Sequence, residues 1–421
     1  MRRVITLLTS GTRGDVQPLV ALGAGLQRRG YAVRVLTHEP FRGLVAAHGL
    51  GFVPLDGNPN ELFARPELRA ALTYDGGLLR SARSALAYLR AARPLFARML
   101  ASAWQGSQGS GALVVSLPTT WGDQIAEALG IPCVWALTQP LGRTRAFPSP
   151  LQPFGLSLGP WYNALTHALA EHAVWQPWRD MLGRWRRDAL GLAGRTGAGW
   201  AARTAARGDL FLFGYSPRVA PRPPDWPGRF HVTGYWLLER PAGWRPDPSL
   251  LRFLEAGPAL YAGFGGAMAV PDERLLAQVV RGLALAGQRA VLLVGAGAHQ
   301  RALPPHVYPL GAAPHDWLLP QVGAAVHHAG AGTLAAALCA GIPSVCVPFG
   351  ADQFFWSGRA ARLGCAPAPI PARALSAERL AEAIDAAVRQ PIFKQRAAGL
   401  GQQIAAERGV ERAADLIESH L

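Results

Sequence analysis

The sequence HHAGAGTL occupies residues 327–334, between an apolar run at 324–326 and an alanine-rich run at 334–340. The apolar run is typical of the end of a buried strand, and the alanines favour a helix. The glycines between the two runs therefore predict a strand, a glycine-rich turn and a helix. Such a turn directs free backbone N–H groups and the positive end of a helix dipole at one point, which makes it a site for phosphate.

Four residues of this turn are suited to an anion. Gly330 and Gly332 have no Cβ, so an anion can come close to the backbone, and Thr333 and His328 can each donate a side-chain hydrogen bond. The alternative interpretation is an ordinary connection from strand to helix. Glycine-rich turns alone do not separate these two interpretations.

The beginning of the chain has the same alternation. A β-branched apolar run at 4–8 is followed by the loop SGTRGDVQP at 10–18, a helical pattern at 19–29 and a strand at 32–37. Ligands of such βαβ units bind beyond the carboxyl ends of the strands, where Asp15 and His38 both lie. Further strand-like runs, with helical patterns among them, follow at 52–55, 112–116, 132–137, 210–213 and 231–235.

The chain of 421 residues is long for a single hydrophobic core, and the alternation begins again after a stretch rich in proline and charge. We therefore expect an N-terminal domain at 1–235, a linker at 236–248 and a C-terminal domain at 249–405. Residues 406–421 form a closing helix that can pack back on the N-terminal domain. The expected class is α/β with parallel sheets.

The formal net charge of +15 comes almost wholly from arginine, because Lys394 is the only lysine. Such a balance suits nucleic acid, an anionic membrane surface or an acidic ligand. The arginines are scattered and no nucleic-acid-binding motif accompanies them, so we expect no nucleic-acid partner. Four cysteines without C-x-x-C spacing predict reduced thiols in a cytoplasmic protein. No apolar run reaches 18 residues, which predicts a chain without a membrane-spanning helix.

Tryptophan and arginine alternate irregularly through residues 160–207. Interfacial helices use this combination, so peripheral contact with the inner face of a membrane is one interpretation, less favoured than helices that cover the domain. Two other interpretations stay open. The segment can form amphipathic helices that cover the domain, or it can line an apolar pocket for a hydrophobic substrate.

Five motifs, taken in order, resemble the two-domain GT-B glycosyltransferases. They are GTRGDVQP at 11–18, GFG at 263–265, PHDWL at 314–318, HHAGAGT at 327–333 and PFGADQ at 348–353. The sequence is most similar to the branch of the UDP-glycosyltransferase-like family that contains sterol glucosyltransferases and glycopeptide-antibiotic glycosyltransferases. The resemblance implies two Rossmann-like parallel-sheet domains that face each other across a cleft.

The resemblance also implies an activity, which is inverting transfer of a sugar from a nucleoside-diphosphate sugar to a hydroxyl of a small hydrophobic acceptor. The second domain holds the donor, the first holds the acceptor, and no cofactor or metal is required. The helix N-terminus and a histidine can stabilise the leaving diphosphate, and a carboxylate can take the acceptor proton. UDP and TDP both stay open, because Ala336 stands where plant relatives have a ribose-binding Glu.

By resemblance, each motif has its own residues and role. Asp15 is the general base, and Thr12, Arg13 and Gly265 belong to supporting loops. The resemblance implies that the diphosphate is bound by His328, Gly330, Gly332 and Thr333. It implies that Trp317 contacts the nucleoside base and that Asp352 and Gln353 bind the sugar hydroxyls.

Some alternatives stay open at this stage. Asp15 can serve only as the cap of the helix near Pro18, and the resemblance assigns no role to His38 or His327. Ala329 replaces a glycine usual in this branch, so we expect its φ to be below zero. The rival functions are a nucleotide-sugar-binding auxiliary protein with weak or no catalysis and a sugar-nucleotide epimerase of the same architecture.

Overall fold

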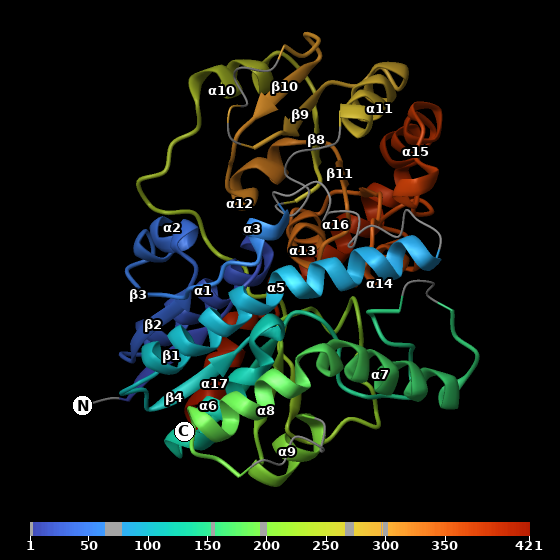
Figure 1. Cartoon of the computed structure of the whole chain (residues 1–421). Coiled ribbons are helices and arrows are strands. Elements are labelled where there is room, and N and C mark those ends of the chain that lie inside the picture. The colour runs from blue at the N-terminus through green and yellow to red at the C-terminus, as the bar shows by residue number, and fades with distance from the viewer. Residues whose placement is uncertain are drawn as a thin grey trace. The chain divides into compact units, whose positions relative to one another are not determined.

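The chain folds into two compact units in a computed structural model (Figure 1). The structure describes residues 3–63, 78–152, 156–193, 200–265, 273–295, 297 and 302–421. Unit 1 comprises residues 1–217, 221–236 and 408–421, and unit 2 comprises residues 218–220 and 237–407.

Unit 1 is built on a seven-stranded parallel sheet in the order β3-β2-β1-β4-β5-β6-β7. The strands are β1 Val4–Leu8, β2 Ala32–Thr37, β3 Gly51–Pro54, β4 Ala112–Val115, β5 Cys133–Leu137, β6 Leu210–Phe213 and β7 Phe230–Val232. Strand order reverses direction between β1 and β4, and in parallel sheets ligands bind at the carboxyl side of such a switch point.

Unit 1 also contains helices, several of which contact strands of this sheet. They are α1 Arg13–Arg28, α2 Arg42–Ala46, α3 Asn60–Phe63, α5 Leu78–Gly106, α6 Asp123–Leu129, α7 Pro160–Trp175, α8 Arg179–Asp188, α9 Trp200–Arg207 and α17 Gly409–His420. The last of these, coloured red in Figure 1, lies among the blue elements of unit 1. Arg29 at the end of α1 forms ion pairs with Asp415 at 2.6 Å and with Glu418 at 3.2 Å, which join α17 to α1.

Unit 2 has a five-stranded parallel sheet in the order β10-β9-β8-β11-β12. Its strands are β8 Leu260–Gly263, β9 Ala290–Leu293, β10 Val307–Leu310, β11 Ala325–His327 and β12 Ser344–Cys346. Its helices are α10 Pro248–Glu255, α11 Glu273–Leu285, α12 His315–Leu318, α13 Ala331–Cys339, α14 Gln353–Arg362, α15 Ala377–Arg389 and α16 Pro391–Ala405. Buried apolar clusters lie on both faces of this sheet. The predicted α/β class with two parallel sheets is confirmed.

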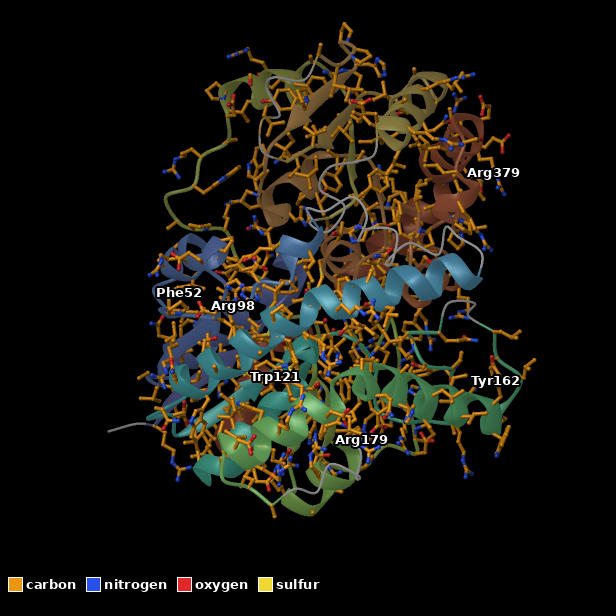
Figure 2. All side chains as sticks on the ribbon, in the orientation of Figure 1. Phe52, Arg98, Trp121, Tyr162, Arg179 and Arg379 are labelled. Carbon is orange, nitrogen blue, oxygen red and sulfur yellow. The ribbon has the colours of Figure 1, made fainter. Side chains whose placement is uncertain are left out.

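Much of the segment at 160–207, outside the undescribed residues 194–199, is held by buried ion pairs. Arg186 of α8 donates to Glu127 of α6 at 2.6 and 2.9 Å. Arg207 of α9 donates to Asp209 at 2.6 Å and, with Arg203, pairs with the fully buried Asp123. Trp185 packs on Trp121, which is labelled in Figure 2. These arginines and tryptophans therefore attach α8 and α9 to the rest of unit 1.

A membrane-spanning helix would need length and continuous apolar character together. Among the residues that the structure describes, no helix has both.

Candidate active site

The turn after β11 leads directly into a helix of nine residues, α13, which begins at Ala331 with Gly330 as its N-cap. Gly332 and Thr333 thus lie inside the first helical turn and not before it, three residues earlier than the sequence pattern indicates. Within the described chain no side chain caps this helix. A Cβ added at Gly332 would meet nothing within 4 Å, so the first N–H groups are open to approach.

The imidazole of His328 lies between two glycines, Gly265 after β8 and Gly330 after β11. A Cβ added at Gly265 would stand 2.6 Å from Cε1 of His328, and one at Gly330 would overlap Nε2. We expected the missing Cβ of Gly330 to make room for an anion. In the structure it makes room for the histidine ring, and Gly332 is the glycine whose surroundings are open.

His328 is neutral at physiological pH, because burial lowers its pKa to about 4. Its Nδ1 atom is buried, and the Gly263 backbone raises the pKa of the ring against the larger effect of burial. A neutral imidazole offers one N–H donor to an anion instead of a full positive charge. The fixed N–H dipoles of α13 then supply the rest of the attraction.

Ala329 adopts φ +61°, so the expectation of a φ below zero was wrong. The physical reason lies in His327, whose Nδ1 accepts a hydrogen bond from the Ala329 N–H at 3.0 Å. His327 is fully buried at the end of β11, so its ring is fixed and the hydrogen bond fixes the left-handed backbone of Ala329. Because Nδ1 accepts, the neutral ring carries its proton on Nε2. The bond gives His327 a structural task that the sequence left unassigned.

Asp352 and Gln353 lie at the start of α14, in the turn that follows β12. Gln353 Oε1 accepts the N–H groups of Phe349 at 2.8 Å and of Gly350 at 3.3 Å. The group that Gln353 can offer to a sugar is therefore its Nε2 amide, a donor. Asp352 accepts the indole N–H of Trp356 through Oδ2 at 3.0 Å.

Trp317 of α12 packs against Trp244 of the predicted linker, with ring centroids 5.1 Å apart and an angle of 55° between the planes. The neighbouring Asp316 accepts the Arg240 N–H at 3.1 Å, so the linker is attached to α12 at two points. Sequence reasoning missed Trp244. Its signal in the sequence was a large aromatic residue inside a stretch rich in proline and charge, which indicates a packing role.

In unit 1, Asp15 is the third residue of α1, which begins at Arg13 and contains Pro18 in its interior. Asp15 Oδ2 accepts the Thr12 N–H at 2.8 Å and the Thr12 hydroxyl at 3.1 Å. Arg13 points along the helix to Gln17, with its Nε atom 2.8 Å from Oε1. Asp15 therefore takes part in a capping box. This contact holds the carboxylate in place and does not decide whether Asp15 also acts as a base.

A buried polar network supports the loop that carries Asp15. The Thr9 hydroxyl donates to the Asp15 carbonyl at 3.2 Å and accepts from Ser116 at 3.0 Å. His38 Nδ1 lies 2.8 Å from the Leu55 carbonyl and must donate to it, so Nε2 accepts from the Ser10 hydroxyl at 2.8 Å. Burial lowers the pKa of His38, which keeps the ring neutral. Polar residues directly after three adjacent strands were the signal for this network.

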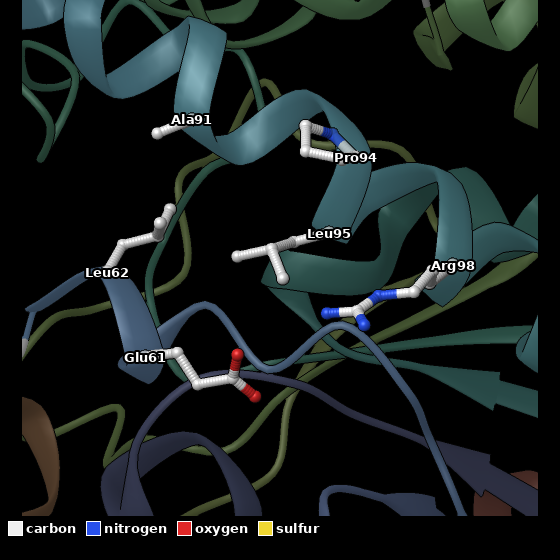
Figure 3. A pocket seen from close by; sticks show the side chains of 6 residues that line it. All are labelled: Glu61, Leu62, Ala91, Pro94, Leu95 and Arg98. Atoms are coloured by element: carbon white, nitrogen blue, oxygen red, sulfur yellow. The ribbon is translucent and has the colours of Figure 1, made fainter.

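Unit 1 also has a cavity of about 360 Å³ between α3 and α5, lined by Glu61, Leu62, Ala91, Pro94, Leu95 and Arg98. Figure 3 shows the Glu61 carboxylate and the Arg98 guanidinium directed into the same space, beside the apolar side chains. The charge of Glu61 acts on the pKa of His38 and raises it against the larger effect of burial. The cavity therefore lies near the network of Ser10 and His38.

The structure superimposes on the calicheamicin glycosyltransferase CalG4 with a TM-score of 0.67 and 20% identity, over 100% of this chain and 98% of that one. For the Streptomyces glycosyltransferase SsfS6 complexed with thymidine diphosphate the TM-score is 0.64 at 17% identity, over 99% and 100%. Residues 5–148 match the glycosyltransferase family 28 N-terminal domain, and residues 287–418 match the erythromycin biosynthesis protein CIII-like C-terminal domain. The chain has the GT-B fold of these glycosyltransferases.

Curated relatives of this GT-B chain include two fungal sterol 3-beta-glucosyltransferases. That of Neurospora crassa is 34% identical over 98% of this chain and 27% of its own length. That of Candida albicans is 35% identical over 99% of this chain and 28% of its own length. The chain thus spans little more than a quarter of these relatives. The resemblance to the sterol glucosyltransferase and antibiotic glycosyltransferase branch is confirmed.

The left-handed Ala329 gives a prediction for stability. An alanine at positive φ is strained, and glycine is not, so Ala329→Gly should raise the free energy of unfolding by about 1 kcal/mol. The matched control is Ala335→Gly inside α13, where the same exchange should lower it by about 1 kcal/mol. Urea unfolding of the full chain measures both. A destabilised Ala329→Gly variant would show that the turn is not strained.

The two histidines of the turn give a prediction for pH. Burial lowers the pKa of His327 to about 3 and that of His328 to about 4, whereas an unfolded histidine has a pKa of about 6.5. Since the folded values are lower, the unfolded chain binds more protons between about pH 6.5 and pH 4, and stability falls as the pH falls through that window.

We expect the urea midpoint of unit 2 to decrease from about pH 6.5 to pH 4, and to decrease less in His328→Asn. Unfolding curves recorded at several pH values, with hydrogen exchange of β11 to report on unit 2, measure the effect. An equal decrease in the variant and the parent would contradict the lowered pKa of His328.

Proposed function

We propose that this chain is an inverting glycosyltransferase, which moves a sugar from a nucleoside-diphosphate sugar to a hydroxyl of a hydrophobic acceptor. The observation that carries this proposal is the uncapped N-terminus of α13 beside the neutral ring of His328. The bound thymidine diphosphate of SsfS6 supports UDP or TDP as the nucleotide. The similarity to sterol 3-beta-glucosyltransferases supports an acceptor such as a sterol, another lipid or a polyketide.

The proposed donor site lies in unit 2. The N–H groups of Gly332 and Thr333, with His328, bind the diphosphate and stabilise the negative charge that grows on it as it leaves. Gly330 gives the His328 ring its space. Asp352 accepts hydrogen bonds from the sugar hydroxyls and Gln353 donates to them. Trp317 packs beside the nucleoside base, with Trp244 behind it.

The proposed acceptor site lies in unit 1. Leu62, Leu95 and their apolar neighbours in the cavity suit the body of a hydrophobic acceptor, while Glu61 and Arg98 suit a polar end. The acceptor oxygen attacks the anomeric carbon, and the bond from that carbon to the diphosphate oxygen breaks. Asp15 takes the hydroxyl proton, and the configuration at the anomeric carbon inverts.

The resemblance also implies that no metal is needed. The described residues contain no group of three or more His, Cys, Asp or Glu side chains arranged to hold a metal ion. Metal independence stays a prediction. In the proposed mechanism, helix α13 and His328 stabilise the leaving group in the way that a cation would.

The proposal predicts the effect of Asp15→Asn. Asparagine keeps a side-chain oxygen that can accept the Thr12 N–H, so the fold should persist, while the loss of the base should lower the transfer rate by about 10²–10⁴-fold. The measurement is release of nucleoside diphosphate from UDP-glucose and dTDP-glucose with a panel of hydrophobic alcohols, alongside titration of UDP and dTDP binding, which should not change.

The matched control is Asp247→Asn, because Asp247 caps α10 by accepting the Ser249 N–H at 2.7 Å. That variant should turn over at the parent's rate. If Asp15→Asn does so too, Asp15 only caps its helix and is not the base.

We also propose peripheral membrane contact, at α7 and the residues before it. The expectation rested on tryptophan and arginine, but Arg186, Arg203 and Arg207 form ion pairs within unit 1. The better support is exposed apolar surface, with Trp161 78%, Leu158 67% and Leu169 58% exposed, on a chain of net charge +15.

A vesicle experiment tests the proposed membrane contact. Trp161→Ser combined with Leu169→Ser should weaken sedimentation with phosphatidylglycerol vesicles at least about tenfold, because the exposed apolar side chains that enter the membrane are lost. Neutral phosphatidylcholine vesicles should bind the parent weakly. The proposed contact is wrong if the parent sediments equally with both kinds of vesicle. It is also wrong if the parent and the variant sediment equally with phosphatidylglycerol vesicles.

A further inference from the structure

Asp352 is the N-cap of α14, but it does not cap the helix. Its backbone is helical, with φ −70° and ψ −7°, and no side-chain capping bond is present. Asp247, the N-cap of α10, shows the usual arrangement, with ψ 132° and a carboxylate that accepts the Ser249 N–H. An aspartate at an N-cap normally stabilises its helix by about 1 kcal/mol. At Asp352 this contribution is not made, so the carboxylate is held elsewhere.

The group that holds it is the indole of Trp356, one turn further along α14. The Trp356 N–H donates to Asp352 Oδ2 at 3.0 Å, and the Trp356 residue is 1% exposed. The ring packs edge-to-face against Phe355 at 5.0 Å. A buried indole has little freedom to rotate, so its N–H fixes the direction of the carboxylate.

The rest of the loop is fixed in the same way. Gln353 closes the turn on the backbone of Phe349 and Gly350. Phe349 packs edge-to-face on Phe264 at 5.9 Å, and Phe264 directly precedes Gly265, which touches His328. The loop of Asp352 is therefore connected by packing to the turn proposed to bind the diphosphate, and the two can keep a constant spacing.

We propose that Trp356 is a positioning residue for donor-sugar recognition. Its indole N–H, from the next turn of the same helix, holds the Asp352 carboxylate in one direction, in which it can meet the hydroxyls of the donor sugar. The inference rests on the proposed function, in which Asp352 binds the sugar. Without the indole N–H the carboxylate is free to leave this direction, and binding the sugar must then also restrict its rotation.

The test compares ligands with and without the sugar. In Trp356→Phe the aromatic ring stays and the N–H is lost, so UDP-glucose or dTDP-glucose, whichever the parent binds, should bind about tenfold more weakly. UDP or dTDP, which has no sugar to contact Asp352, should bind as it does to the parent. Isothermal titration calorimetry on the full chain measures both affinities. Trp121→Phe, which removes an indole bond to the Pro118 carbonyl in unit 1, is the matched control and should change neither.

One further variant separates the possible failures. Asp352→Ala should remove the contribution of the sugar to binding. If Asp352→Ala removes it and Trp356→Phe leaves it intact, the positioning role is overturned and the proposed role of Asp352 stands. If Asp352→Ala leaves it intact, the role of Asp352 and this inference fall together. Equal weakening of the sugar nucleotide and the bare nucleotide in Trp356→Phe would also overturn the inference, because it would indicate general damage to unit 2.

Trp356 is buried, so a second variant guards against a chain that does not fold. Asp352→Glu keeps the indole and the charge but moves the carboxylate by one methylene. Binding of the sugar nucleotide should weaken by about the same factor as in Trp356→Phe, with the bare nucleotide unaffected. If Asp352→Glu binds the sugar nucleotide as the parent does, the direction of the carboxylate is unimportant and the inference is wrong.

Discussion

The imidazole of His328 is packed into space that a side chain at Gly265 or Gly330 would fill. That one contact joins the loop after β8 to the turn after β11 and the start of α13. It also excludes water from the ring, which keeps the imidazole neutral and leaves an N–H available. The ring of His328 therefore requires glycine at positions 265 and 330. The open surroundings of Gly332 give a ligand access to the N-terminus of α13.

Two aspartates at helix starts show how the same residue type is put to different uses. Asp15 accepts both the N–H and the hydroxyl of Thr12, so α1 itself holds the carboxylate. Asp352 makes no capping bond and is held by Trp356. A carboxylate engaged in a cap is rigid without any other support, while one withheld from its cap needs another donor to hold it. The second arrangement loses helix stability in exchange for a chosen direction.

The alternation of strands and helices made the parallel α/β units predictable from sequence. The spacing of apolar residues and the position of glycine-rich turns can both be read from short stretches of the chain. The purpose of Gly330 was not predictable, since it depends on where a ring from a neighbouring residue packs. The φ of Ala329 depended on a bond from its N–H to His327, which no propensity encodes. Arg186 of α8 and Arg203 of α9 looked interfacial because their partners, Glu127 and Asp123, are distant in the sequence.

Backbone strain in the described chain is confined to a few turns. Its non-glycine residues with positive φ are Ala329, Ala351 and Arg408. Ala329 and Ala351 lie in the two turns that carry His328 and Asp352, and Arg408 lies where the chain returns to unit 1 as the N-cap of α17. Each position costs about 1–2 kcal/mol and persists only where surrounding contacts impose it. At Ala329 the contact is known, and it is the buried ring of His327. Two of the three strained residues therefore lie in turns that direct a side chain, His328 in one and Asp352 in the other.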